Sequence, residues 1–202
     1  MILAIESAIA GGSVSFLQGA SAFASWKGDS DVSRAEDLLP AISALMSENG
    51  VARNDLSLIA VSAGPGSFTG IRIGVSTAIG LGTGLRIEVA SASILKAMAS
   101  AARSENVMAA VPMGRSAICI QSFDASKDEL RPLTEPATIT EIEFTQLAAA
   151  APGELVIHGA LAKFCKERSV LDLGFDLATV LGKYCHQHPN EREKPLFISK
   201  SF

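Results

Sequence analysis

The stretch Gly64-Pro-Gly-Ser-Phe-Thr-Gly70 constrains the fold of this chain more than any other feature, because three glycines and a proline within seven residues define a tight turn. The apolar run Leu58–Ala63 before the turn predicts a buried strand, and small and apolar residues continue at helical spacing behind it to about Gly84. A strand, a glycine-rich turn and a helix occur in this order at phosphate-binding loops. The turn therefore predicts an α/β unit and raises the question of nucleotide binding.

Two phosphate-binding motifs compete for this turn. A Walker A loop ends in Gly-Lys-Ser/Thr, and no lysine is present here. A dinucleotide loop has the spacing GxGxxG, whereas this turn has GxGxxxG, and Pro65 has no N–H to offer a phosphate. Glu88 nevertheless stands at about the distance of a ribose-binding acid, so the dinucleotide reading stays open as an alternative.

The first half of the sequence predicts three meandering strands followed by α-helical crossovers. A capping box at Ser33 and Glu36 opens a helix at about Ala35, and Asn49-Gly50 ends it. The strands are expected over Ile2–Ser7, Ser13–Leu17, Ala22–Trp26, Leu58–Ala63 and Ile87–Ala90, and a further helix over Ser93–Arg103. The order βββαβαβα describes a ribonuclease H-like fold, with a mixed sheet flanked by helices.

The second half repeats this order in a shorter form. Strands are expected over Val107–Val111, Ala117–Phe123, Leu130–Pro136 and Leu155–His158. Thr140 and Glu143 form a second capping box before a helix to about Ala150, and Ala160–Glu167 and Leu177–His186 are helical candidates. The sequence thus predicts two tandem ribonuclease H-like domains, 1–102 and a reduced 103–202, the architecture of the actin/sugar kinase/Hsp70 superfamily. The last helix is a candidate to pack back on the first domain.

The helix behind the glycine turn has one face of small residues, since Gly70, Gly74 and Ala78 recur every four residues with Ile73, Thr77 and Gly80 beside them. Small residues let a second backbone approach closely, which strengthens dispersion contacts. One neighbour of this helix is its own sheet. The sequence predicts that the second neighbour of this helix is a partner protein.

The composition favours a soluble cytoplasmic protein. The 202 residues carry a formal net charge of −4 without a basic run, which disfavours direct binding of RNA by this chain alone. Three cysteines without CxxC spacing fit free thiols. Met1–Glu6 lacks the basic start of a signal peptide, and Ile73–Leu85 is too short to span a membrane.

The segment from Ile59 to Gly74, with Gly64–Gly70 at its centre, resembles the signature of the TsaB (YeaZ) family nearly residue for residue. The opening Ile2–Ser7, the helix start Ala35–Pro40 and the tail Pro195–Ile198 stand where that family places similar segments. The likeness covers the first hundred residues well and the last hundred loosely.

The resemblance implies a partner role. Similar proteins form a four-helix contact through the helix after Leu38-Leu39-Pro40 and the helix after the glycine turn, with a second copy of themselves or with the paralogous catalytic subunit TsaD. An ATPase, TsaE, joins the pair, and the complex transfers threonylcarbamoyl to N6 of adenosine 37 in tRNAs that read ANN codons. The matching interface positions here are Leu39, Ile42, Leu45, Met46, Ser67, Phe68, Thr69, Arg72, Ile73, Ser76 and Thr77.

The same resemblance implies that this chain is not an enzyme by itself. ATP-using members of the superfamily hold Mg²⁺-phosphate with carboxylates at the ends of the first strand of each domain. Here Glu6 replaces the usual Asp and is the one weak cofactor-binding candidate, the region 112–115 has no acid, and His158-Gly159-Ala160 keeps one glycine of a pair. No cofactor is expected.

Metal sites are not expected either. The wider family has been described as metalloprotease-like, yet His158, His186 and His188 form neither HxxxH nor HExxH. On a helix, His186 and His188 point about 200° apart. Two other functions stay open: a homodimeric binding module unrelated to tRNA, and an ATP-dependent enzyme that uses Glu6. Ile42→Glu or Ile73→Glu is expected to abolish association while leaving the fold intact.

Overall fold

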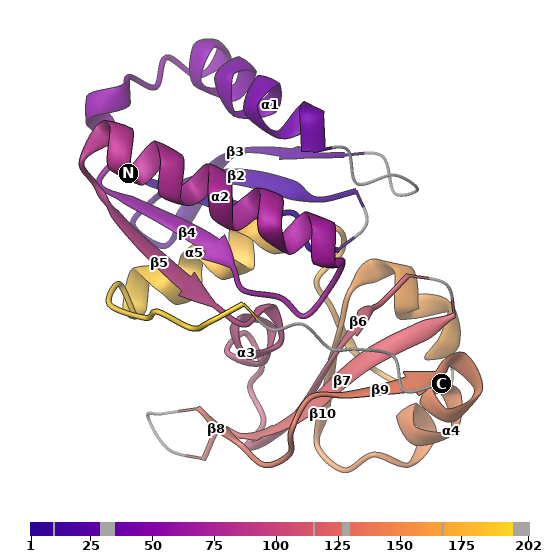
Figure 1. Cartoon of the computed structure of the whole chain (residues 1–202). Helices are drawn as coiled ribbons and strands as arrows, with labels where there is room; N and C mark the ends of the chain where they lie inside the picture. Colours follow the sequence, from indigo (N-terminus) through magenta and orange to yellow (C-terminus); the bar gives the residue numbers. More distant parts are fainter. Residues whose placement is uncertain (10, 29–34, 115, 127–129, 167, 196–202) are drawn as a thin grey trace.

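The chain folds into two mixed β-sheets with helices around and between them (Figure 1). The computed structural model describes all residues except 10, 29–34, 115, 127–129, 167 and 196–202. The expected capping residue Ser33 and the tail residues from Leu196 onward lie outside the described residues. Within the described part of the chain, no helix is both long and apolar enough to cross a membrane.

The first sheet has five strands in the order β3-β2-β1-β4-β5. Its first three strands form an antiparallel meander, and β4 and β5 add in parallel to β1. The strands are β1 Ile2–Glu6, β2 Ser13–Gln18, β3 Ser21–Lys27, β4 Leu58–Ser62 and β5 Glu88–Ala92. The connecting helices are α1 Ala35–Glu48, the 3₁₀ turn η1 Arg53–Asp55 and α2 Phe68–Leu85. The antiparallel start distinguishes this sheet from a dinucleotide-binding unit, so the open alternative built on Glu88 is wrong.

Both faces of the first sheet are covered, because side chains alternate along each strand. Leu3 and Ile5 of β1 pack with the helices α1 and α2. Ile2 and Ala4 point the other way and pack with the last helix, α5 Leu177–Gln187. The continuous burial of β1 follows from this two-sided cover.

The second sheet repeats the topology of the first. Its path is β11-β10-β6-β7-β8, and β9 also pairs with β7. As in the first sheet, the opening strands are antiparallel and the following strands add in parallel. The strands are β6 Asn106–Pro112, β7 Ala117–Asp124, β8 Arg131–Pro132, β9 Ala137–Thr140, β10 Glu154–Ile157 and β11 Leu171–Asp172. The connections are α4 Glu141–Ala150 and the 3₁₀ helix η2 Gly159–Phe164, so the second copy is reduced, as the sequence predicts.

The closing helices of the two repeats pack across the molecule. The helix α3 Ile94–Ala99 follows β5 of the first sheet yet packs on β6, β7 and β10 of the second. The helix α5 follows β11 of the second sheet and packs on the first. The two helices also contact each other, and one apolar core runs through both of them and both sheets. The last helix therefore returns to the first sheet, while the domain boundary at 102/103 stays a prediction.

Three expected elements differ from the sequence prediction. The strand expected over Leu130–Pro136 is split into the two-residue β8 and, beyond Pro136, the separate strand β9. Pro132 and Pro136 have no N–H to continue one ladder. The helix expected over Ala160–Glu167 is a short 3₁₀ helix, and the helix expected over Ser93–Arg103 ends at Ala99. The cap of Thr140 and Glu143 is confirmed, with both bonds formed.

The close contact between α5 and the first sheet can be tested by a substitution at Gly182. A Cβ on Gly182 would lie 2.4 Å from Cδ1 of Leu17 and 3.1 Å from Cβ of Ala4. We expect Gly182→Val to lower the free energy of unfolding by about 1–3 kcal/mol, because the added methyl groups overpack this contact. Chemical denaturation measures the change. Lys183→Ala, at the neighbouring exposed position, serves as the control and is expected to change stability little.

Candidate partner-binding site

The glycine-rich turn lies against the turn between β1 and β2. A Cβ on Gly66 would stand 2.3 Å from the carbonyl oxygen of Ala8, and one on Gly70 would stand 2.0 Å from that of Ser7. The N–H of Ser67 donates to Ala8 O at 2.6 Å, and the Ser7 hydroxyl donates to Gly70 O at 2.8 Å. The glycines are therefore required by a close approach of two backbones within this chain.

The helix α2 begins at this turn, and Ser67 caps it. The hydroxyl of Ser67 accepts a hydrogen bond from the N–H of Gly70 at 3.3 Å. The small face of the helix is buried, since a Cβ on Gly74 would lie 2.3 Å from the Ser7 hydroxyl oxygen, and Ala78 is fully buried. Gly70, Gly74 and Ala78 are therefore covered within this chain, whereas contact of a partner protein with the residues beside them stays a prediction. The second neighbour of this small face is the β1–β2 turn.

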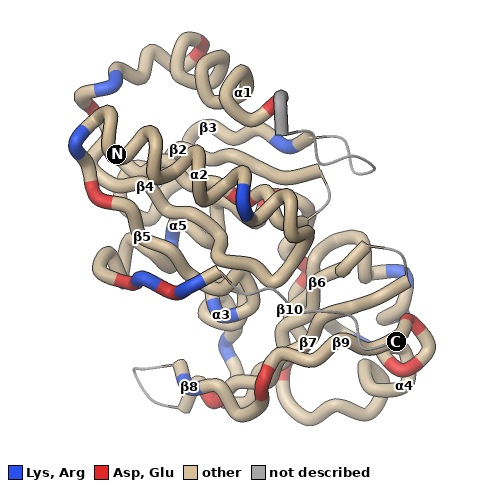
Figure 2. The backbone as a smooth tube through the Cα atoms, in the orientation of Figure 1, with Lys and Arg blue, Asp and Glu red and all other residues tan. Residues whose placement is uncertain are grey.

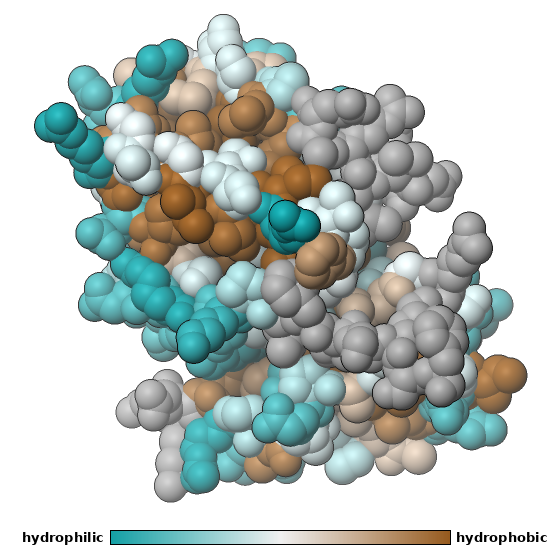
Figure 3. Space-filling model, viewed as in Figure 1, coloured by the Kyte–Doolittle hydropathy of each residue, from teal (hydrophilic) through white to brown (hydrophobic). Residues whose placement is uncertain are grey.

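A different pair of glycines on α2 faces open space. A Cβ on Gly80 or Gly84 would meet nothing within 4 Å. Both glycines line a groove of about 590 Å³ between α1 and α2. We call this the α1–α2 groove, and its lining residues are Leu3, Leu39, Ile42, Ser43, Met46, Ser47, Val51, Ala52, Arg53, Leu56, Gly80, Leu81, Gly84 and Leu85. Apolar residues gather beside α2 on the face shown in Figure 3.

The predicted interface residues fall into three groups. The exposed ones are Leu39, Ser67, Phe68, Thr69, Arg72 and Ser76. The partly buried ones are Met46, Ile73 and Thr77. Ile42 and Leu45 are buried, at 4% and 7% exposure. The structure brings Leu39, Ile42 and Met46 together with the open glycines in the α1–α2 groove, whereas Ser67–Thr69 and Arg72 lie toward the other end of α2.

The burial of Ile42 corrects one expectation. Its side chain lies in the apolar core with Leu3, Ile5 and Leu45, and it forms the floor of the groove. A carboxylate placed there loses its hydration without gaining a partner. Ile42→Glu is therefore expected to disrupt the fold, contrary to the prediction from the sequence. The partly buried Ile73 packs against the same core.

Sequence reasoning missed Gly84 as a site residue and took it as the approximate end of the helix. The signal was available, because Gly84 continues the row of Ile73, Thr77 and Gly80 along one side of α2. What the sequence does not show is which of the two small faces is covered. Both consist of residues that permit close approach, and the tertiary fold fills one and leaves the other open.

At the start of α2, an arginine is stacked on an aromatic ring. The guanidinium carbon of Arg72 lies 5.3 Å from the ring centroid of Phe68, which is 55% exposed. Stacking of this kind restricts the arginine without using its outward hydrogen-bond donors. Exposed aromatic and arginine side chains are the types that contribute most at protein interfaces.

Glu6, the candidate cofactor ligand, points into its own loop. The carboxylate Oε1 accepts hydrogen bonds from the N–H groups of Ala8 and Ile9 at 2.7 and 3.1 Å. The side chain is buried, and this desolvation raises the pKa of Glu6 from 4.5 to about 7, with the two N–H groups acting in the opposite direction. The N–H groups of Ala8 and Ile9, after the end of β1, are therefore bonded to Glu6 and are not available to a bound anion.

The corresponding end of the second sheet is filled by side chains. Nδ1 of His158 accepts the N–H of Ala160 at 3.2 Å, and its ring meets the edge of Phe175 with centroids 4.9 Å apart. A Cβ on Gly159 would lie 2.9 Å from the same phenyl ring. Burial lowers the pKa of His158 to about 4, so the imidazole is neutral at pH 7. Arg115 lies outside the described residues.

The described residues include no group of three or more His, Cys, Asp or Glu side chains placed to hold a metal ion. In the Cys185–His188 stretch, Cys185 is buried and its desolvation raises the thiol pKa to about 12. His186 is exposed, and the ring of His188 stacks on Tyr184 at 4.5 Å. The three side chains thus face different surroundings.

A family model described as "TsaD: tRNA N6-adenosine threonylcarbamoyltransferase" matches residues 31–177. Two relatives named tRNA threonylcarbamoyladenosine biosynthesis protein TsaB match in part. The protein from Haemophilus influenzae is 41% identical over 78 residues, and that from Bacillus subtilis is 37% identical over 65 residues. These matches cover 37% and 32% of this chain, and they span only 33% and 28% of the relatives' own lengths.

Two solved structures from Pseudomonas aeruginosa share the whole fold. One is YeaZ, and the other is described as an uncharacterized protein with similarity to peptidase YEAZ. Both have a TM-score of 0.68 and cover 98% of this chain and 99% of their own, at 22% and 23% identity respectively.

The two sheets of like topology define an α/β protein of the actin/sugar kinase/Hsp70 type, in which the carboxylate of Glu6 at the end of the first strand is bonded within its own loop. The family model and the named relatives make the assignment specific. This chain belongs to the threonylcarbamoyltransferase-related family that the model describes and, within it, to the TsaB (YeaZ) proteins.

The raised pKa of Glu6 predicts a pH-dependent stability. The folded protein retains the Glu6 proton up to about pH 7, whereas the unfolded chain releases it near pH 4.5. The Glu6 contribution to the free energy of unfolding is therefore fully present below pH 4.5 and declines by about 3 kcal/mol at most as the pH rises to about 7. Glu6→Gln, which keeps the amide oxygen as acceptor, should remove this slope in denaturant titrations between pH 4.5 and 8. An equal slope in wild type and variant would contradict the assignment.

Proposed function

We propose that this chain is a non-catalytic subunit of a complex that forms N6-threonylcarbamoyladenosine at position 37 of tRNAs reading ANN codons. It binds a TsaD-like catalytic subunit, with a TsaE-like ATPase as a further member, and contacts tRNA only through the complex. The observation that carries the proposal is the α1–α2 groove on a chain of the TsaB (YeaZ) family.

The groove suits a helix from a partner protein. Its floor and walls are mostly apolar, and the open glycines Gly80 and Gly84 permit another backbone to come close to α2. Leu39 on α1 is 53% exposed at its rim. An amphipathic helix with a row of apolar residues would bury these surfaces, as in other helix-in-groove contacts.

The non-catalytic role is supported by the interior of the molecule. In the superfamily, nucleotide chemistry needs carboxylates that face a phosphate-bound metal ion. The carboxylate of Glu6 is bonded within its own loop. The ring of Phe175 packs directly against Gly159 and fills the space beside this glycine. The chain therefore offers a partner a rigid surface without a reactive centre of its own.

A second candidate is a homodimer, because the same groove accepts a helix of a second copy as readily as one of a paralogue. The family resemblance of the sequence also implies such self-association for the chain when it is alone. Sedimentation equilibrium of the pure protein, with and without TsaD, separates the two occupants. A dimer that TsaD dissociates indicates that both use one surface.

The role of the groove in binding is tested by a substitution that fills it with a side chain of this protein. Gly80→Leu places a side chain in the groove, and since no atom lies within 4 Å of the added Cβ, the fold should be retained. The helix itself gains about 0.8 kcal/mol from the loss of glycine. We expect affinity for TsaD, measured by isothermal titration, to fall at least about tenfold, or by about 1.4 kcal/mol. Thr83→Leu, an exposed change on the same helix outside the groove lining, is the matched control. Normal binding by Gly80→Leu would place the partner elsewhere.

The function is tested by reconstitution. Threonylcarbamoyl transfer to tRNA is assayed with TsaD and TsaE, with and without this chain, and we expect activity to require it. Glu6→Ala should leave the transfer rate unchanged if the folded protein is recovered, because Glu6 takes no part in the reaction. Full activity in the absence of this chain would contradict the proposal, and loss of ATP-Mg²⁺ binding in Glu6→Ala would favour an active enzyme.

A further inference from the structure

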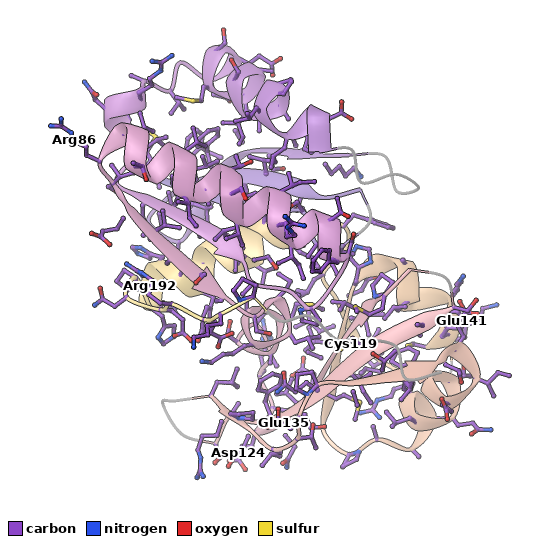
Figure 4. All side chains as sticks on the ribbon, viewed as in Figure 1. Arg86, Cys119, Asp124, Glu135, Glu141 and Arg192 are labelled. Carbon is purple, nitrogen blue, oxygen red and sulfur yellow. The ribbon has the colours of Figure 1, made fainter. Side chains whose placement is uncertain are left out.

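The segment after α5 returns to the free edge of the first sheet. Residues 191–193 run beside β5, with Arg192 opposite Ser91 in a parallel bridge. The N–H of Ser91 donates to Glu191 O at 3.0 Å, and the N–H of Glu193 donates to Ser91 O at 2.9 Å. Figure 2 shows the alternating acidic and basic residues of this segment beside β5, and Figure 4 labels Arg192 there. The segment thus covers part of an edge that would otherwise present unpaired backbone groups.

The acidic side chains of this segment converge on one lysine of α3. Nζ of Lys96 lies 2.7 Å from Glu191 Oε1 and 3.2 Å from Glu193 Oε1. These three side chains are 24%, 19% and 31% exposed, so the ion pairs are partly shielded from water. Glu193 Oε2 also accepts the N–H of Ser93 at 2.7 Å, at the first residue before α3.

The position of Lys96 lets these contacts connect several elements of the fold. The chain passes from the first sheet to the second through α3, and α3 packs on the second sheet. Nζ of Lys96 also lies 5.8 Å from the ring centroid of Tyr184 on α5, and the Tyr184 hydroxyl donates to Glu191 at 3.4 Å. One cluster therefore joins the edge of the first sheet, the connection to the second sheet and the helix between the two sheets.

We propose that residues 191–193 are an intramolecular brace, which fixes the angle between the two halves of the molecule by holding α3 to β5 and α5. Within the described residues, the chain passes between the two sheets twice, once through α3 and once from β11 to α5. The apolar core that α3 and α5 share still permits small sliding of packed helices, and directional ion pairs between these elements restrict it. The Lys96 cluster lies directly on the first crossing and ties it to the second.

The brace is tested by removing the charge of Lys96 while keeping a side chain of similar length. Lys96→Met takes away both ion pairs and retains most of the apolar stem. Spin labels are placed at Ser25→Cys on β3 and Gln146→Cys on α4, two exposed positions in different halves, since Cys119, Cys165 and Cys185 are all buried. Pulsed electron resonance then measures the distribution of distances between the labels. We expect it to broaden at least about twofold in Lys96→Met.

The matched control is Arg192→Ala in the same segment. Arg192 pairs with Glu88, whose side chain is 78% exposed, and this pair does not reach α3. The control should keep the narrow distribution of the unaltered protein. An equally narrow distribution in Lys96→Met would overturn the proposal, as would equal broadening in both variants.

A second variant guards against a folding defect in Lys96→Met. Glu191→Gln with Glu193→Gln keeps both side chains nearly the same size and weakens the ion pairs. Hydrogen exchange at the amides of Ser91 and Ser93, which are bonded to residues of the brace, should accelerate at least about tenfold. Unchanged exchange at both amides in a folded variant would also overturn the proposal.

Discussion

The contact between the β1–β2 turn and the start of α2 is the constraint on which the rest of the structure depends. Gly66 and Gly70 permit the backbone of Ser7 and Ala8 to pack directly on the helix, at distances that no Cβ would tolerate. This contact fixes the position of α2 on the first sheet. It also determines which side of α2 is buried inside the molecule and which side remains open.

The same packing determines which residues the other side of α2 exposes. With Gly74 and Ala78 turned inward, Gly80 and Gly84 face the space between α1 and α2. The groove is thus a consequence of how the helix is seated. A glycine-rich signature that resembles a phosphate loop serves first to seat a helix and, through that seat, to shape a surface.

The turn at the end of β1 also determines where the carboxylate of Glu6 points. Glu6 closes its own loop by accepting two backbone N–H groups, and in the second repeat His158, directly after β10, packs against the ring of Phe175. An apolar core that runs through α3 and α5 joins the two sheets. The open groove and the packed interior are therefore two results of one arrangement of helices.

The sequence by itself determined the order of strands and helices in the first half, the repeated topology, the capping of α4, and the family. These depend on local turns, caps and alternation, which short stretches encode. It did not determine the split at Pro132–Pro136 or the short 3₁₀ helix after His158. Nor did it separate the buried small face of α2 from the open one, or show that Ile42 belongs to the core. Those points were decided by tertiary structure, because burial depends on which distant segment covers a residue, and both faces of α2 carry the same kinds of residues.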